Sequence, residues 1–292
     1  MKKWMQCAAV LLIGGLTAGC IHQPYTDQPR PMTVIDRESG SGTKYSFDAM
    51  AGLNEPSSGG ERDRTAPSAL VMNSTDQVLM RVSRDRDAVG YVSVGAVTPK
   101  VKALSINGVH PSAEAAETGR YPLTRQVYLV FCGNEPQEAV LDFLDFIRSR
   151  EGTGILIRQG FVPAWEKQKS YRPRSVSGHI SVGGSSSLRP VMQRLIAAYE
   201  AYQPHVRVSL QDGDSLMGVH MVLSGTVSIG LLSRPLTAAE EQDGAQSWLM
   251  AKQAVAVVVN PENPIEDISS EELKNIYTGR MTIWPDTKGR HS

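Results

Sequence analysis

The sequence predicts an α/β fold, because strand-like and helix-like segments alternate along the chain. Residues 190–202 are typical of a helix: apolar residues recur every three or four positions, and Pro190 stands where the first helical turn tolerates proline. Residues 254–259 are very apolar and β-branched, which is typical of a strand buried on both faces. The 292 residues suffice for one large domain or two lobes.

The other elements are predicted from the helical spacing of apolar residues, from apolar and β-branched runs, and from helix-capping residues. Ser269 with Glu272 three residues later predicts a capped helix over 269–277. We expect further strands at 33–36, 89–94, 102–106, 127–131, 179–182, 206–210 and 227–232. We expect further helices at 44–51, at 136–148 with Val140, Leu141, Leu144 and Ile147 on its apolar face, and from Ser215 to near Gly225. Residues 54–68 predict a loop and residues 164–176 a linker, since both are polar and contain proline.

Charge and composition exclude several classes of protein. Lysine plus arginine and aspartate plus glutamate are both 30, and this balance argues against a nucleic-acid binder, which normally has a basic excess. No apolar run reaches the ~20 residues that span a bilayer, which excludes a multi-pass membrane protein. The 26 glycines and 17 prolines are near ordinary usage, which excludes a collagen-like or wholly disordered chain.

The N-terminus predicts export. A basic start, a short apolar stretch and small residues before Cys20 form a signal peptide over 1–19. A cysteine in this position is similar to that of a bacterial lipobox, so we expect Cys20 to carry a lipid, and residues 20–31 to be a tether from a bacterial membrane. The alternative is an ordinary signal peptide with an incidental cysteine.

Cys132 is then the one other cysteine of the mature chain. A lone cysteine inside an apolar run is typical of a small buried core residue. It has no partner for an intramolecular disulfide, and no Cys/His spacing predicts a metal site. We expect neither a metal nor a cofactor.

Three turns share one order: a strand, then glycine and serine or threonine, then a helix. They occupy residues 39–43, 183–187 and 213–215, with Arg37 beside the first and Arg234 after the strand that follows the third. Helix N-termini expose unpaired N–H groups and a positive dipole end, so such turns favour an anion, especially phosphate. Each serine or threonine taken alone also suits an ordinary N-cap.

Alternatives to anion binding have weaker support. Residues 39–44 are glycine-rich but lack the Gly-Lys-Ser/Thr order of a P-loop. Residues 185–187 offer a serine nucleophile without the Gly-x-Ser-x-Gly elbow of hydrolases, and the six histidines are scattered. We expect the acidic pairs 240–241 and 271–272 to be solvated helix starts.

Residues 180–236 contain the motifs Gly184-Ser185-Ser186, Asp214-Ser215 and 230–236, and the motifs 257–265, 276–279 and Trp284 follow them. By these motifs, residues 180–236 and the stretch that continues to Trp284 resemble the first part of the periplasmic phosphate-binding protein of Pst-type ABC transporters. The later part of the same family resembles residues 34–163, through the motifs at 37–43, 90–92, 121–125 and 151–163. The two halves therefore stand in reversed order, and we expect a circular permutant joined by the linker 164–176. The alternative is a remnant of a tandem gene whose halves pair between molecules.

The resemblance implies a two-lobed periplasmic-binding-protein-like fold with the ligand in a cleft between lobes. One lobe would combine residues 32–118 and 261–292, and the other would be the continuous middle, 119–260. The resemblance also implies the phosphate-binding residues, which we assign as Arg37, Ser41, Gly42, Thr43, Ser186, Ser187, Ser215 and Arg234. Arg234 stands where the family usually has an aspartate that accepts a hydrogen bond from protonated phosphate, so discrimination from sulfate is in doubt unless Asp214 replaces it. The alternative is that the side chain of Arg234 turns outward on the lobe surface.

The leading hypothesis is a lipid-anchored, non-enzymatic protein that binds inorganic phosphate or a similar oxyanion and delivers it to an ABC permease. A second hypothesis is a degenerate binding fold that acts as a sensor, scaffold or adhesin. A third is a hydrolase using a serine of 185–187, which would require a histidine and an aspartate beside it.

Overall fold

The computed structural model describes residues 31–57, 60–133, 137–166 and 168–285. The predicted signal peptide, Cys20 and all of the tether except Pro31 lie outside these residues. Within them, no helix combines the length and the apolar character needed to cross a lipid bilayer.

The described chain is an α/β fold, as predicted. Its strands are β1 (Thr33–Arg37), β2 (Asn54–Ser57), β3 (Gly60–Asp63), β4 (Leu70–Met72), β5 (Ala88–Ser93), β6 (Lys102–Ala103), β7 (Ser105–Ile106), β8 (Thr124–Cys132), β9 (Phe161–Pro163), β10 (Gly178–Ser185), β11 (Val206–Gly213), β12 (Ile229–Leu232), β13 (Ala245–Val259) and β14 (Asp267–Ile268). Its α-helices are α1 (Gly42–Ala51), α2 (Thr75–Arg84), α3 (Ala113–Glu117), α4 (Glu138–Arg148), α5 (Arg150–Arg158), α6 (Arg189–Tyr202), α7 (Ser215–Leu223), α8 (Ala238–Gln242) and α9 (Ser270–Tyr277). Two short 3₁₀ turns are η1 (Val94–Ala96) and η2 (Ser186–Leu188).

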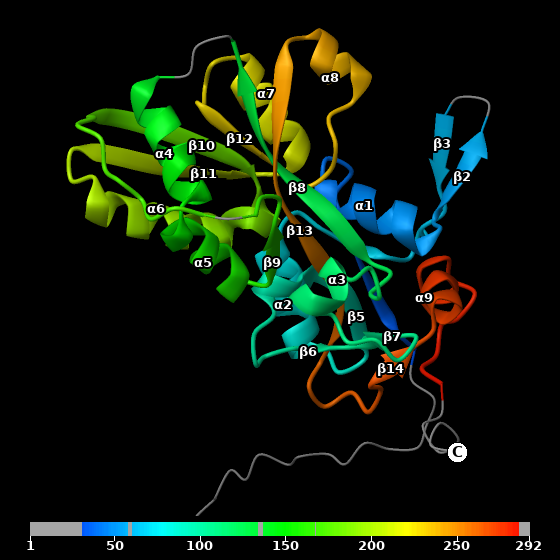
Figure 1. Cartoon of the computed structure of the whole chain (residues 1–292). Helices are drawn as coiled ribbons and strands as arrows, with labels where there is room; N and C mark the ends of the chain where they lie inside the picture. Colours follow the sequence, from blue (N-terminus) through cyan, green and yellow to red (C-terminus); the bar gives the residue numbers. More distant parts are fainter. Residues whose placement is uncertain (1–30, 58–59, 134–136, 167, 286–292) are drawn as a thin grey trace, which may run out of the picture.

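One mixed sheet runs through the whole molecule in the order β11-β10-β12-β8-β13-β5-β1-β4. β10 pairs in parallel with β11 and β12, and β1 pairs in parallel with β4 and β5. The two long strands between these groups, β8 and β13, are antiparallel to each other and to their outer neighbours. Figure 1 shows β8 and β13 crossing the centre of the molecule and joining its two parts.

Buried side chains of the described residues form four hydrophobic cores, and the two largest lie in different lobes. The middle lobe, which contains α4–α8 and β9–β12, has a core from α4, α5, α6 and the strands they cover, including Phe143, Phe146 and Tyr199. The terminal lobe, which contains α1–α3, β1–β7, β14 and α9, has a core built from both ends of the described chain, including Phe47, Tyr91 and Tyr277. Met32 N donates to Thr282 O at 2.8 Å, which ties these two ends together.

Several local predictions are confirmed. The predicted stripe of α6 is its buried face: Val191, Met192, Leu195, Ile196 and Tyr199. Ser269 caps α9 in a full capping box with Glu272. Residues 254–259 of β13 are all fully buried, because their side chains pack into two hydrophobic cores, one holding residues 254, 255, 257 and 259 and the other residues 256 and 258.

Other predictions are wrong. Residues 54–68 contain the β2–β3 hairpin, whose side chains are polar and mostly exposed, so no apolar alternation revealed it. Cys132 is exposed, because β8 extends beyond its buried part and ends there. Leu141, predicted on the apolar face of α4, is 39% exposed. Phe143 and Phe146 are the aromatic side chains on the buried face of that helix.

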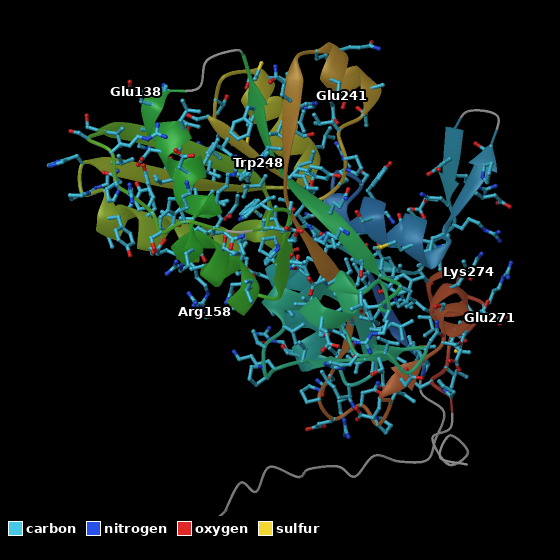
Figure 2. All side chains as sticks on the ribbon, viewed as in Figure 1. Glu138, Arg158, Glu241, Trp248, Glu271 and Lys274 are labelled. Carbon is cyan, nitrogen blue, oxygen red and sulfur yellow. The ribbon has the colours of Figure 1, made fainter. Side chains whose placement is uncertain are left out.

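The predicted linker packs against the middle lobe. The hydroxyls of Tyr171 and Tyr199 both donate to Asp142, a fully buried carboxylate on α4. Trp165 stacks on Trp248 with ring centroids 5.2 Å apart and planes 4° apart. Trp248 is partly buried, whereas Glu138 and Arg158, labelled in Figure 2, are exposed at the edge of the molecule.

Candidate functional site

The N-terminus of α1 brings one set of polar groups to the boundary between the lobes. Ser41 caps the helix by accepting from Lys44 N, and Thr43 is 1% exposed in the first turn. Gly42 lies close against the other lobe. A Cβ at this position would lie 2.3 Å from Oγ of Ser215 and 2.7 Å from Oγ of Ser233. The turn therefore needs glycine there in order to reach the middle lobe.

The middle lobe presents a chain of buried serine hydroxyls to this turn. Ser185 Oγ lies 2.9 Å from Ser187 Oγ and 3.0 Å from Ser233 Oγ. Ser233 Oγ lies 3.2 Å from Ser215 Oγ, at the start of α7. Ser185 ends β10, Ser187 follows it, Ser215 begins α7 and Ser233 follows β12. The parallel pairing of β10 with β12 brings the ends of those two strands together.

Arg125 joins the two lobes at this point. It is 4% exposed on β8, and its guanidinium donates from Nη1 to Thr43 Oγ1 at 2.7 Å and from Nη2 to Ser187 Oγ at 3.0 Å. No described carboxylate pairs with it, and its buried Nε has no hydrogen-bond partner. Burial and the nearby charge of Arg37 lower the pKa of Arg125 to about 9. A buried positive charge without a counter-charge favours the binding of an anion.

Arg37 is the second buried arginine, and its charge is already balanced. The guanidinium donates to both carboxylate oxygens of Glu38, at 2.7 and 2.6 Å. Its Nη2 also donates to Ser186 Oγ at 3.3 Å, which is a second contact between the lobes. Ser186 Oγ accepts from Thr75 N as well, at 3.3 Å.

A buried charge cluster supports β1 and α1 behind these groups. Lys44 Nζ lies 2.7 Å from Asp36, 3.1 Å from Asp48 and 2.9 Å from Asp63. Asp36 also accepts from the Tyr91 hydroxyl at 2.6 Å. Burial raises the pKa of Asp48 to about 7, against the opposing effect of Lys44. The cluster fixes the position from which Arg37 and Thr43 face the other lobe.

The structure brings most of the sequence-predicted residues together but not Arg234. Its guanidinium makes a two-pronged ion pair with Glu240, at 2.8 and 2.6 Å, and lies 6.0 Å from the centre of the Tyr45 ring. Both members of the pair are buried, so Glu240 is not the solvated helix start that the sequence predicted. The residues gathered at the lobe boundary are Arg37, Ser41, Gly42, Thr43, Ser186, Ser187 and Ser215.

The sequence reasoning missed Arg125, Ser185 and Ser233 as site residues. A signal for Arg125 was present, since it stands between Leu123 and Val127 at the inward position of a largely apolar strand. A charged residue in such a position is expensive to bury unless it has a function. Ser185 lay within the predicted turn 183–187 but was not assigned to the ligand, and Ser233 lay outside the three predicted turns, because only the pairing of distant strands makes the two serines neighbours.

Comparison with known proteins identifies the family. The family model described as a PBP superfamily domain matches residues 2–151 and 170–291. The phosphate-binding protein PstS 2 of Streptococcus agalactiae is 33% identical over 291 residues, covering 98% of this chain and 99% of that protein. The chain belongs to the PstS family of the PBP superfamily. The sequence-based recognition of the family is confirmed.

A solved structure and a partial relative add to this. The crystal structure of a phosphate-binding protein of a phosphate ABC transporter from Streptococcus pneumoniae matches with a TM-score of 0.68 and 34% identity, covering 87% of this chain and 98% of that one. The phosphate-binding protein PstS of Bacillus subtilis is 32% identical over 119 residues, which are 39% of each chain. The match to the S. pneumoniae structure confirms the predicted PBP-like fold.

Proposed function

We propose that this chain binds inorganic phosphate, or a similar oxyanion, between its two lobes, as the substrate-binding protein of an ABC transporter. The observation that carries the proposal is Arg125, a buried guanidinium that pairs with no described carboxylate and is held between Thr43 of one lobe and Ser187 of the other. Binding an oxyanion there supplies the missing counter-charge and accepts charge-assisted hydrogen bonds from the arginine. The names of the streptococcal relatives point to the same ligand.

The contacts support a binding role over hydrolysis. The hydroxyls of residues 185–187 bond, among the described residues, to arginine, to other serines and to the amide of Thr75. A serine nucleophile needs a general base within hydrogen-bond reach, and none of these partners serves as one at neutral pH. Lobes that close around a ligand are a common hinge motion, and β8 and β13 are the strands that cross between the lobes here.

Isothermal titration calorimetry tests the proposal directly. Phosphate titrated into anion-free protein should give saturable heat with one site per chain. Circular dichroism on the same sample establishes that the protein is folded. A folded protein that gives no heat with phosphate or with sulfate would refute the proposal.

We also propose that the order of the two halves is a circular permutation. A permuted chain aligns with an unpermuted relative over one continuous half only, which is the pattern of the B. subtilis match. The streptococcal relatives align along nearly their whole length, as expected of proteins that share the permuted order. Thr43 and Ser187 of a single chain meet at Arg125, which favours an intramolecular fold over pairing between molecules. A dimer that alone binds phosphate, while its monomer does not, would contradict this.

Export and lipid anchoring at Cys20 complete the proposal. They rest on the sequence of residues 1–20 and fit a protein that delivers its ligand to a permease in a bacterial membrane. Mass spectrometry of the N-terminal peptide from native membranes tests this. A diacylglyceryl-modified Cys20 is expected, and an unmodified mature N-terminus would contradict it.

A further inference from the structure

A buried glutamine lies where the chain crosses between the lobes. Gln253 is fully buried on β13, directly opposite Arg125 in the pairing of the two crossing strands. In the same sheet it also pairs with Phe161 of β9, which belongs to the middle lobe. Both lobes therefore contribute to the surroundings of Gln253, and a change in the angle between them alters the contacts of its side chain.

Only one end of the Gln253 amide has a hydrogen-bond partner. Its Oε1 accepts from the hydroxyl of Ser93 at 2.5 Å, and Ser93 is itself 1% exposed at the end of β5. Its Nε2 has no hydrogen-bond partner among the described residues. A buried polar group without a partner costs free energy, so it destabilises the lobe angle at which it is buried.

A close contact between the lobes separates this NH2 group from a cavity. Gly95 lies in η1 of the terminal lobe, where an added Cβ would be 2.3 Å from the carbonyl oxygen of Gln159 in the middle lobe and 3.3 Å from Nε2 of Gln253. The cavity measures about 570 Å³ and lies between the lobes, because residues 94–98 and 158–160 both line it. Gln253 is not among its lining residues. The contact of Gly95 with Gln159 therefore closes the cavity off from the amide.

We propose that Gln253 is a hinge residue that favours separation of the lobes. Separation withdraws η1 from Gln159 and gives the unpaired NH2 group access to solvent in the cavity. A group that destabilises one of two arrangements shifts the population towards the other. This rests on the proposed function, in which the lobes close around a ligand, and deepens it by naming a residue that sets how readily they reopen. Gln253 acts here through the lobe angle and not by touching the ligand.

Two variants that share one substitution should act in opposite directions. Ser93→Ala removes the one hydrogen bond that the structure gives to the Gln253 amide, so separation should be favoured further. Ser93→Ala combined with Gln253→Met removes the amide together with its partner, so closure should be favoured. The Kd for phosphate should rise about fivefold in the single variant and fall about fivefold in the double variant. Calorimetry measures both.

Small-angle scattering of the phosphate-free proteins gives a measurement that does not depend on the ligand. The radius of gyration should be larger in the single variant than in the double variant. Gln193→Met, at an exposed position of α6, is the control and should change neither Kd nor radius. If Tm shifts in the two variants while Kd and radius stay the same, the amide affects only stability and the inference is overturned. If the folded protein binds no phosphate, the proposed function fails, and the two radii still decide the inference.

Gly95→Ala tests the same contact without altering the amide, and it serves if the double variant does not fold. The added Cβ is too close to the Gln159 carbonyl for the lobes to reach their present approach. The Kd for phosphate should rise about tenfold and the radius of gyration should increase. Circular dichroism establishes that each variant is folded. A folded Gly95→Ala protein with unchanged Kd and unchanged radius would overturn the inference.

Discussion

Thr43 and Ser187 accept hydrogen bonds from the two terminal nitrogens of one guanidinium, that of Arg125. Thr43 begins α1 in the terminal lobe, and Ser187 follows β10 in the middle lobe. Arg125 lies on β8, one of the two strands that cross between the lobes. A single buried charge therefore spans the boundary at which both lobes present their polar turns.

Replacing Arg125 with methionine should separate binding from stability. Arg125→Met removes a buried charge that has no counter-charge, so the Tm of the ligand-free protein should stay the same or rise. Phosphate affinity should fall at least about 100-fold, since charge-assisted hydrogen bonds are lost. Calorimetry and thermal unfolding measure the two effects. Arg120→Met is the control, because Arg120 is exposed, and it should change neither; phosphate affinity retained in Arg125→Met would contradict the assignment.

Gly42 should control how closely the lobes approach. Gly42→Ala places a Cβ 2.3 Å from Ser215 Oγ, so the two helix starts must separate. Phosphate affinity should fall about tenfold or more, while the helix itself gains from alanine. Small-angle scattering with phosphate should show a larger radius of gyration than for the unchanged protein. The control is Gly154→Ala within α5, where the nearest atom is the mobile end of Arg158 at 3.2 Å. Equal effects of the two substitutions on affinity would count against close approach at Gly42.

Glu240 should stabilise the fold without affecting ligand binding. Glu240→Gln keeps a side chain that can complete the capping box of α8 but leaves the buried Arg234 without its counter-charge. The free energy of unfolding should fall by about 3 kcal/mol, and phosphate affinity should stay within about twofold. Urea unfolding and calorimetry measure these, with the exposed neighbour in Glu241→Gln as the control. Loss of phosphate affinity at an unchanged free energy of unfolding would instead indicate that Arg234 takes part in phosphate binding.

Asp48 should make the folded protein less stable as pH rises from about 4 to 7. Burial raises its folded pKa to about 7 from the usual 3.8, so in this range the folded protein holds a proton that the unfolded chain has released. The free energy of unfolding should therefore fall with pH, by at most ~1.4 kcal/mol per pH unit. Asp63 and Glu240, whose pKa values are lowered, act in the opposite sense at lower pH.

Urea unfolding over that pH range checks this. Asp48→Asn should flatten the decline between about pH 4 and 7, because the linked proton is gone. Asp243→Asn, at an exposed position, is the matched control and should leave the slope as it is. If the free energy of unfolding declines with pH equally steeply in Asp48→Asn, a group other than Asp48 binds the proton that the folded protein retains.

The sequence predicted helices correctly where their stripe or cap is formed by residues a few positions apart. The stripe of α6 and the capping box of α9 involve residues a few positions apart, so their patterns are complete within one segment. The β2–β3 hairpin was missed because its exposed polar strands show no apolar alternation. Glu240 was predicted to be solvated but is buried, because it pairs with Arg234. Arg234 follows β12 and lies outside α8, so the residue pattern of the helix alone did not indicate the pair.

The sequence by itself determined which turns begin helices with free N–H groups, because Ser41 and Asp214 cap α1 and α7 through bonds within their own segments. It also determined the family, through motifs spread over both halves. Only the tertiary structure decided that Arg125 lies between hydroxyls of both lobes and that Arg234 pairs with Glu240. Both are buried arginines, and what separates them is the partner: hydroxyls of two lobes, distant in sequence, for Arg125, and the nearby carboxylate of Glu240 for Arg234.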